Sequence, residues 1–253
     1  MPQKRTAIIT GATSGIGEAT ASLLAGHNFR LVLCGRRKDR LEKLRQGLSL
    51  KTEVTTLSFD VRDKGAVAAA FQSLDDGWRQ ADVLVNNAGN AHGLAPIQSG
   101  SVEDWDAMID INVKGLLYVS HEVLPAMVKK NSGHIVNLGS IAGKEAYPNG
   151  NVYCASKFAV DALTKGMRMD LNAHGIKVTA IHPGLVETEF SLVRFKGDKG
   201  RADAVYQGYQ PLRAEDIADM VLFALTRPPH VVVADLVVFP VAQASSTIVR
   251  KSL

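Results

Sequence analysis

The chain has 253 residues, of which 46% are hydrophobic and 21% are charged, a composition typical of a folded globular protein rather than a disordered one. Its 29 basic and 25 acidic residues are spread along the sequence with a formal net charge of +4, so no block of like charge indicates a nucleic-acid partner. No stretch reaches the ~18 apolar residues that a membrane span requires, and we expect a cytoplasmic protein without a membrane partner. Cys34 and Cys154 lack the spacing of a metal site or a disulfide framework, so we expect buried free thiols and no metal.

The first apolar run, 6–10, leads into the glycine-rich sequence T-G-A-T-S-G-I-G and then into a helical pattern. Backbone N–H groups of such a turn, together with a helix N-terminus, can bind a phosphate. The spacing differs from the dinucleotide fingerprint G-x-G-x-x-G, and a turn that only reverses the chain is the alternative. Because strand, turn and helix follow one another in the right order, we favour phosphate binding. The candidate contacts are Gly11, Thr13, Ser14, Gly15, Ile16 and Gly17.

A second predicted strand, 30–34, is followed by Gly35, Arg36 and Arg37. In a dinucleotide-binding fold an acidic residue at this strand end bonds the adenosine ribose hydroxyls, but Gly35 holds that position here. Arginine guanidinium groups match a 2′-phosphate, so the sequence favours NADP(H) over NAD(H). Arg36 is the better candidate for the phosphate contact. The alternative is that both arginines only open the next helix, with Arg37 solvated.

The third and fourth predicted strands, 53–58 and 83–85, end at Asp60-Val61 and at Asn86-Asn87-Ala88-Gly89. Ligands bind outside the carboxyl ends of the strands in open parallel sheets. Small and amide side chains at such an end let a flat ligand approach closely, although a plain turn of the Asn-Gly type competes with this interpretation.

Asn112 falls on the apolar face of the next predicted helix, which a Ser101/Asp104 capping pair opens. A buried amide must be hydrogen-bonded, so Asn112 is either structural or part of a polar site. The fifth predicted strand, 134–138, ends at Gly139-Ser140. Ser140 therefore stands where sheet topology puts active-site residues, and a simple turn residue is the alternative.

A predicted helix from about 151 to 172 carries Tyr153 four residues before Lys157, so the two side chains share one face. A nearby ammonium favours the phenolate and moves the tyrosine pKa from ~10 toward neutrality, although such pairs are also common on solvated helices. The same helix carries a stripe of small residues: Ala155, Ala159, Ala162 and Gly166. Small side chains let another helix approach closely, so we expect tight packing, which a subunit interface could provide.

A sixth predicted strand, 177–182, and Pro183–Thr188 lead into a charged stretch, 185–212, with little apolar periodicity. A segment of this length inside a compact domain is usually a lid or a binding loop. An amphipathic helix around 217–224 and a seventh strand, 231–239, complete the pattern, and the tail after 241 is unassigned. About seven strands alternating with six helices predict one doubly wound Rossmann-type α/β domain over 1–253, a parallel sheet with helices on both faces.

These ordered motifs resemble those of the short-chain dehydrogenase/reductase family over essentially the whole chain. The matching residues are T-G-A-T-S-G-I-G (10–17), Asp60-Val61, N-N-A-G (86–89), Asn112, Ser140, Tyr153 with Lys157, and P-G-L-V-E-T (183–188). Gly139 departs from the second serine that many members carry, but Ser140 keeps the catalytic place.

The resemblance implies hydride transfer between a nicotinamide and a carbonyl or alcohol carbon, with Tyr153 as the proton donor or acceptor. Ser140 would bond the substrate oxygen, and Lys157 would bind the nicotinamide ribose while lowering the tyrosine pKa. Asn112 would hold a water that links Lys157 to solvent.

The resemblance also implies the contacts of the cofactor. Asp60 and Val61 would contact the adenine, and the segment from Asn87 through Ala88 to Gly89 would contact the nearby ribose. The nicotinamide end would meet Pro183, Gly184, Val186 and Thr188, with Val186 and Thr188 fixing the carboxamide.

A narrower resemblance is to the NADP-dependent 3-hydroxy acid dehydrogenases, the group that includes serine 3-dehydrogenase and L-allo-threonine dehydrogenase. It rests on S-V-E-D-W-D-A-M-I-D, G-N-V-Y, T-E-F-S-L-V-R-F-K-G-D and F-P-V-A-Q-A-S. It implies a homotetramer that oxidises the 3-hydroxyl of small acids such as L-serine, L-allo-threonine or 3-hydroxypropionate, the last giving malonic semialdehyde. A carboxylate substrate requires a cation. The lid offers Arg194 and Lys196, and we expect Arg194 to pair with the substrate.

Two alternatives stay open at this point. One is an NADPH-dependent reductase of ketones, diketones or 3-oxoacyl thioesters, since this fold accepts many carbonyl compounds. The other is a non-catalytic NADP-binding sensor. The complete set of Asn112, Ser140, Tyr153 and Lys157 argues against the sensor, because a pure binder has no use for the tyrosine.

Overall fold

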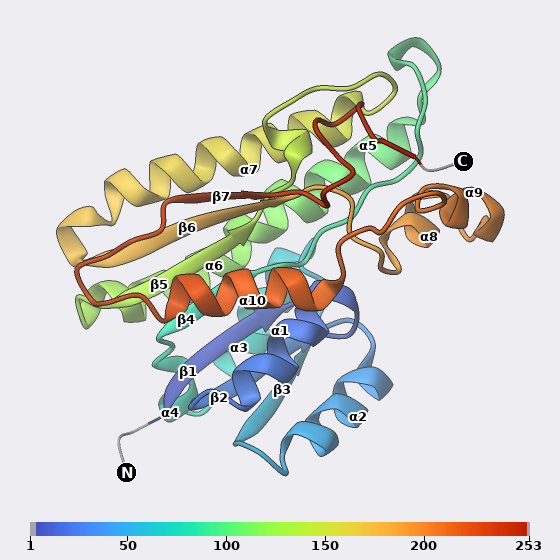
Figure 1. Ribbon diagram of the computed structural model, residues 1–253. Helices are drawn as coiled ribbons and strands as arrows, with labels where there is room; N and C mark the ends of the chain where they lie inside the picture. Colours follow the sequence, from blue (N-terminus) through green and yellow to red (C-terminus); the bar gives the residue numbers. More distant parts are fainter. Residues whose placement is uncertain (1–3, 252–253) are drawn as a thin grey trace.

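Seven strands form one parallel sheet in the order β3-β2-β1-β4-β5-β6-β7 (Figure 1). The computed structural model describes residues 4–251. The strands are β1 (Arg5–Thr10), β2 (Phe29–Gly35), β3 (Val54–Ser58), β4 (Val83–Asn86), β5 (Gly133–Leu138), β6 (Ile176–Pro183) and β7 (Asp235–Val238). The chain moves outward from β1 to β3 and then returns to β4 beside β1, so the loops after β1 and β4 diverge at the carboxyl edge. A crevice at this point is where open α/β sheets bind ligands.

Helices cover both faces of the sheet, which confirms the predicted doubly wound fold (Figure 1). One face packs against α1 (Gly15–Ala25), α2 (Lys38–Leu48) and α10 (Ala214–Leu225), and the other against α3 (Lys64–Gln72), α6 (Gly115–Lys129) and α7 (Asn151–Asp170). Leu24, Leu41 and Val221 belong to the first apolar core, and Val67, Val119 and Met127 to the second. Burial of both faces explains why the strands read as continuous apolar runs.

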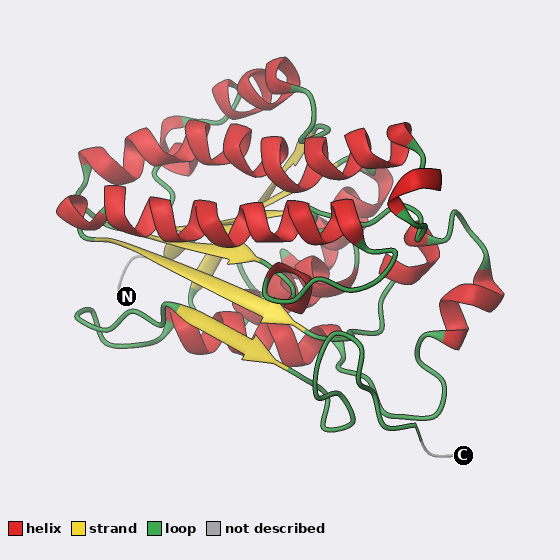
Figure 2. Cartoon of the chain, turned by 90° about the horizontal axis from the view of Figure 1, so that it is seen from above, coloured by secondary structure: helices red, strands yellow, loops and turns green. Residues whose placement is uncertain are grey.

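The remaining elements are short. They are α4 (Asp76–Arg79), α5 (Val102–Ile109), α8 (Phe190–Arg194) and α9 (Lys199–Ala204), with the short turns η1 (Ile97–Ser99), η2 (Asp110–Lys114), η3 (Ile141–Gly143) and η4 (Asn172–His174). Figure 2 shows the strands from above, with long loops at the ends to which the arrows point. No helix in the described part of the chain is both long and apolar enough to span a membrane.

The charged stretch 185–212 contains α8 and α9, and its two ends pair as a parallel bridge between Val186 and Leu212. Both helices have six residues or fewer, too few to show a helical period in the sequence. Asp198 caps α9 by accepting a hydrogen bond from the Arg201 N–H at 3.0 Å. The segment that we call the lid (185–212) is thus a long loop with two short helices, and its two ends lie side by side.

One sequence expectation differs from the structure in detail. β7 begins at Asp235 instead of 231, because the carbonyls before it are taken by side chains: Lys177 Nζ donates to Val231 O and Thr179 Oγ1 to Val233 O. In the small-residue stripe on α7, Ala155 and Ala162 are exposed on the single chain, so the expected tight packing across a subunit interface stays a prediction. Cys34 and Cys154 are buried free thiols, as expected.

Candidate active site

A cavity of about 470 Å³ opens at the carboxyl edge of the sheet. Its walls come from the loops after β1 to β6, from the start of α7 and from the lid. The predicted cofactor contacts that line it are Gly11, Thr13, Ser14, Gly15, Ile16, Arg36, Arg37, Asp60, Val61, Asn87, Ala88, Gly89, Pro183, Gly184, Val186 and Thr188. Ser140, Tyr153, Lys157 and Arg194 also line it, whereas Gly17 and Asn112 lie behind the wall. Most of the predicted site therefore converges on one cavity.

The glycine turn is shaped to approach a ligand closely. Gly11 and Gly15 have φ of +64° and +53°, conformations that favour glycine. A Cβ on Gly17 would lie 2.4 Å from Gly11 O, so Gly17 serves the packing of α1 against the turn. The N-cap residue Ser14 makes no side-chain hydrogen bond to α1, which leaves first-turn N–H groups for an anion. These features fit the pyrophosphate of a dinucleotide.

The turn after β4 holds the glycine turn in place. Asn87 Nδ2 donates to Thr10 O at 2.9 Å, and the Ala88 N–H donates to Thr10 Oγ1 at 2.9 Å. A Cβ on Gly89 would lie 2.8 Å from Asn112 Oδ1 and 3.6 Å from Lys157 Nζ. The two strand ends that flank the crevice are thus joined by direct hydrogen bonds, and Gly89 leaves room beside the lysine.

The two arginines after β2 have different partners. The Arg36 side chain is 56% exposed and forms an ion pair with Asp60 at 3.5 Å. Arg37 donates to Ser14 Oγ at 2.7 Å, and to Glu189 of the lid at 2.9 Å. The interpretation of Arg37 as merely solvated is therefore wrong, because this side chain joins the glycine turn to the lid.

Asp60 is held mainly by a neighbouring arginine. Arg62 donates to its carboxylate from Nη2 at 2.7 Å and from the backbone N–H at 3.0 Å. Partial burial alone would raise the Asp60 pKa, but the bonds from Arg62 bring that pKa below its ordinary value. The carboxylate is thus charged at neutral pH and lies at the cavity wall with Val61.

Asn112 lies on η2, a π-helical turn inserted between α5 and α6. Such turns are rare in proteins, and those that occur are often found at functional sites. Its Nδ2 donates to Asn90 O at 2.9 Å and to Ser156 Oγ at 3.0 Å, and its Oδ1 accepts from the Asn90 N–H at 2.9 Å. The amide therefore joins the loop after β4 to α7. Asn112 thus has the structural role that was one of its two predicted roles.

Ser140, Tyr153 and Lys157 meet at the cavity wall beside the end of β5. Ser140 Oγ caps η3 by accepting from the Ala142 N–H at 3.1 Å, and its side chain is close enough to Tyr153 to act on the pKa of the phenol. Lys157 Nζ donates to Leu138 O at 2.9 Å. Tyr153 and Lys157 are only 8% and 7% exposed, so the pair is not a solvated one.

The pKa values of this pair differ from the sequence expectation. Burial raises the pKa of Tyr153 above its ordinary value, an effect that the neighbouring Ser140 hydroxyl and the charge of Arg194 oppose only in part. Burial also lowers the pKa of Lys157 to about 8. The predicted lowering of the Tyr153 pKa by Lys157 is not found in the chain by itself, because the ammonium donates to Leu138 O instead of the phenol.

Arg194 of the lid lies directly over the tyrosine. Its guanidinium carbon is 5.5 Å from the ring centroid of Tyr153 and 5.7 Å from that of Tyr147. Nε donates to Gly93 O at 3.2 Å, and the Gly93 N–H donates to Arg194 O at 2.9 Å. Nη2 is buried and has no hydrogen-bond partner in the described part of the chain. Lys196, by contrast, forms an ion pair with Asp104 at 3.0 Å.

The sequence interpretation missed several residues at this cavity. Tyr147 lies in a loop without periodicity, Phe190 packs on Tyr153 with ring centroids 5.7 Å apart, and Glu189 pairs with both Arg37 and Arg40. Glu189 was visible only as one of many lid charges. Gln243 of the unassigned tail also reaches the wall, where its Oε1 accepts from the Leu185 N–H at 2.8 Å.

A family model described as short chain dehydrogenase matches residues 5–198. Sulfoacetaldehyde reductase 2 of Chromohalobacter salexigens is 45% identical over 94% of this chain and 95% of that protein. The NADP-dependent 3-hydroxy acid dehydrogenase YdfG of Escherichia coli (strain K12) is 43% identical over 94% of this chain and 95% of that protein. Among solved structures, the closed form of serine dehydrogenase complexed with NADP⁺ has a TM-score of 0.91 and 42% identity, and covers 96% of this chain and 98% of its own.

Proposed function

The chain belongs to the short-chain dehydrogenase/reductase family, and on that premise we propose that it is an NADP(H)-dependent oxidoreductase of small 3-hydroxy acids. The observation that carries this choice of substrate is the buried Nη2 of Arg194 above Tyr153, which has no hydrogen-bond partner among residues 4–251. A buried donor without a partner costs free energy unless a ligand satisfies it. A carboxylate two bonds from the reacting carbon would do so, and the relatives named for 3-hydroxy acid and serine oxidation support the same substrate class.

We assign the chemistry to the residues around Tyr153. When bound, the nicotinamide of NADP(H) supplies or accepts the hydride. In the reducing direction the Tyr153 hydroxyl gives its proton to the substrate carbonyl oxygen, to which the Ser140 hydroxyl also donates. Arg194 holds the carboxylate, so that the reacting carbon stays beside the tyrosine.

Lys157 serves the same step through its charge. With a pKa lowered to about 8, it is mostly an ammonium at neutral pH, and it would favour negative charge on Tyr153 once the proton has left. The water that Asn112 would hold between Lys157 and solvent remains a prediction of the family resemblance.

The preference for NADP(H) rests on the residues that follow β2. Gly35 offers no carboxylate for the adenosine ribose, and Arg36 and Arg37 both line the cavity. We propose that Arg36 contacts the 2′-phosphate through its solvent-facing guanidinium group, while Arg37 stabilises the turn that carries the pyrophosphate.

A second candidate function is reduction of an aldehyde that carries a sulfonate. One relative is named sulfoacetaldehyde reductase at 45% identity, and the unpaired nitrogen of Arg194 suits a sulfonate as well as a carboxylate. Reduction of neutral ketones, diketones or thioesters would leave this nitrogen without a partner, which makes that alternative weaker.

A substrate panel with both cofactors tests the proposal. We expect turnover of 3-hydroxypropionate, L-serine or L-allo-threonine with NADP⁺ to exceed turnover of a simple secondary alcohol, and NAD⁺ to be the poorer cofactor. Sulfoacetaldehyde with NADPH distinguishes the second candidate. Faster turnover of the neutral alcohol than of every acid would contradict the proposal.

The homotetramer predicted from the family resemblance has support from α7. Its exposed face combines the small side chains of Ala155 and Ala162 with Phe158, which is 43% exposed. A Cβ on Gly166 would meet no atom within 4 Å. We propose that a second copy covers this face, and sedimentation of the wild type and of Gly166→Glu would test it, with a smaller species expected for the variant. A cytoplasmic location stays a prediction of the sequence.

A further inference from the structure

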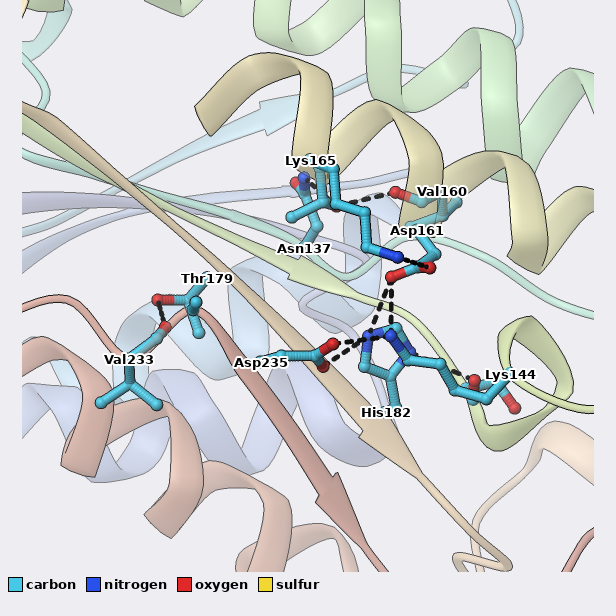
Figure 3. A network of polar contacts seen from close by, with 12 residues as sticks. Asn137, Lys144, Val160, Asp161, Lys165, Thr179, His182, Val233 and Asp235 are labelled. Atoms are coloured by element: carbon cyan, nitrogen blue, oxygen red, sulfur yellow. Dashed lines mark hydrogen bonds and ion pairs between the residues drawn. The ribbon is translucent and has the colours of Figure 1, made fainter. Parts of the chain in front are cut away.

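A partly buried cluster of charged side chains lies between β6, β7 and α7 (Figure 3). At its centre is His182, whose side chain is fully buried. Its Nε2 lies 3.0 Å from Asp235 Oδ1 and 3.6 Å from Asp161 Oδ1. Lys144 Nζ contacts both carboxylates, at 2.6 Å from Asp235 and 2.8 Å from Asp161. Lys165 pairs with Asp161 at 2.7 Å.

The cluster has the residue types of a metal site, but a cation already lies among its ligands. The Lys144 ammonium bonds the carboxylates that a divalent ion would need, and those bonds raise its pKa despite partial burial. Since the lysine stays charged at neutral pH, the two aspartates are neutralised from within the chain. The cluster is therefore a set of internal ion pairs and needs no bound ion.

The cluster holds the turn that carries Ser140 at both of its ends. Ser140 is the N-cap of η3, and Lys144 is its C-cap. At the first end, His182 Nδ1 lies 3.2 Å from the carbonyl oxygen of Ser140. At the other end, the ammonium of Lys144 is fixed by Asp161 of α7 and Asp235 of β7. One connected group of charged side chains thus fixes both ends of the turn that bears the proposed substrate-binding hydroxyl.

His182 also explains the departure at Gly139. A Cβ at position 139 would lie 2.4 Å from His182 Nδ1, a distance that real Cβ atoms do not reach without a shift of the imidazole. The glycine and the histidine are therefore a matched pair in space, and the imidazole occupies the volume that a serine side chain would need.

Burial lowers the pKa of His182, although the charge of Asp235 opposes this effect. A neutral imidazole has a single N–H. Nε2 makes no well-aligned hydrogen bond in the described part of the chain, whereas Nδ1 faces the Ser140 carbonyl. A carbonyl oxygen only accepts, so the Nδ1 that faces Ser140 carries a proton, and Nε2 pairs with Asp235, 3.0 Å away, when it is protonated too.

We propose that His182 is a positioning residue for Ser140, and that the cluster of His182, Asp161, Asp235 and Lys144 fixes the Ser140 hydroxyl beside Tyr153. The consequence for catalysis rests on the proposed function. The mechanical consequence, a rigid 139–144 turn, does not depend on it. Both follow from the hydrogen bond to the Ser140 carbonyl and from the ion pairs of Lys144 at the other end of η3.

The test compares two buried histidines. His182→Ala should lower kcat about tenfold while the KM for NADPH stays unchanged, because only the hydroxyl beside the reacting oxygen is displaced. His134→Ala is the matched control. His134 is 3% exposed on β5 and bonds Thr179 Oγ1 at 2.8 Å, without touching η3. It should lose thermal stability with little change in kcat.

A rescue experiment separates positioning from general damage. Gly139→Ala alone should lower kcat, because its methyl group meets the imidazole. In the His182→Gly background the same methyl group meets no imidazole, so Gly139→Ala/His182→Gly should be as active as His182→Gly alone. If Gly139→Ala costs as much activity in the His182→Gly background as in the wild type, the two positions do not share this space, and the proposed pairing is overturned.

Hydrogen exchange followed by mass spectrometry gives a readout that does not need turnover. In His182→Ala, amides of 139–144 should exchange about tenfold faster than in the wild type, with 10–17 unchanged. Equal exchange in 139–144 for His182→Ala, His134→Ala and the wild type would overturn the positioning role. Absence of wild-type turnover on every substrate would instead overturn the proposed function, while the exchange result still decides the role of His182.

Discussion

The arginine side chains at the two ends of the cavity differ in exposure and in their partners. At the adenosine end, the Arg36 side chain is 56% exposed and is paired with Asp60, and Arg37 is paired with Glu189. At the substrate end, Arg194 has a buried nitrogen without a hydrogen-bond partner in the described part of the chain. The arginines at the adenosine end are thus paired with carboxylates and exposed to solvent, whereas the arginine at the substrate end has a buried donor that a ligand could satisfy.

This difference predicts how much each end discriminates between ligands. An exposed cation interacts through water and contributes roughly 0–1 kcal/mol, so the adenosine end should only bias the choice of cofactor. A buried donor to a charged group contributes about 1.5–3 kcal/mol and is costly to leave unpaired. The substrate end should therefore depend strongly on an anionic group.

The largest loss of activity should follow replacement of Tyr153, which lies where the substrate and the nicotinamide would meet. Tyr153→Phe removes the proton donor while it keeps the ring that packs on Phe190, so we expect kcat to fall about 1000-fold with NADPH affinity unchanged by fluorescence titration. Tyr147→Phe is the matched control, because Tyr147 also contacts Arg194, and it should retain most of the turnover. Equal activity of Tyr153→Phe and the wild type would remove Tyr153 from the chemistry.

At the substrate end, Arg194→Ala should raise the KM for 3-hydroxypropionate about 50-fold, because it deletes a buried charge-assisted hydrogen bond. The KM for NADP⁺ should hardly change. Lys196→Ala is the control from the same lid, since Lys196 is paired with Asp104 outside this contact. An unchanged KM for the acid in Arg194→Ala would show that the carboxylate is bound elsewhere.

At the adenosine end, Arg36→Asp should shift the ratio of kcat/KM for NADPH over NADH about tenfold toward NADH. The shift combines the loss of one cation with repulsion between the new carboxylate and the phosphate. Steady-state rates with both cofactors measure it. If the ratio stays constant, Arg37 or another group holds the 2′-phosphate. Arg36 would then have no part in the choice of cofactor.

The pH dependence concerns Lys157, which serves both ends. Burial lowers its pKa to about 8, so the ammonium is present below that pH and is lost above it. If the charged form supports proton transfer, the rate of carbonyl reduction should fall about fivefold from pH 8 to pH 9, in step with the charged fraction. A rate that stays flat across this interval would contradict the role of the ammonium.

Most of the fold could be predicted from the sequence, because strands buried on both faces show as continuous apolar runs and the glycine turn follows the first of them. The site residues at strand ends, such as Ser140 and Asn87, could be placed by topology alone. What could not be predicted depends on contacts between distant segments. The pairing of Glu189 with Arg37 joins positions 152 residues apart, and local sequence carries no signal for it.

The pKa of Tyr153 shows a second limit of sequence reasoning. The spacing of Tyr153 and Lys157 correctly placed both on one buried face, but burial acts on the two groups in opposite directions. Only the structure shows that Lys157 Nζ donates to Leu138 O. The role of Gly139 was likewise hidden, because His182 reaches it from β6.

The central claim is that the substrate end selects a small anion. The most direct measurement compares kcat/KM of the wild type for 3-hydroxypropionate and for its neutral amide, 3-hydroxypropionamide, with NADP⁺ and with NADPH absorbance as the readout. The two substrates differ in charge but hardly in shape. We predict a ratio of about 50 in favour of the acid. A ratio near one would contradict the account, because the free nitrogen of Arg194 would then have no substrate to bind.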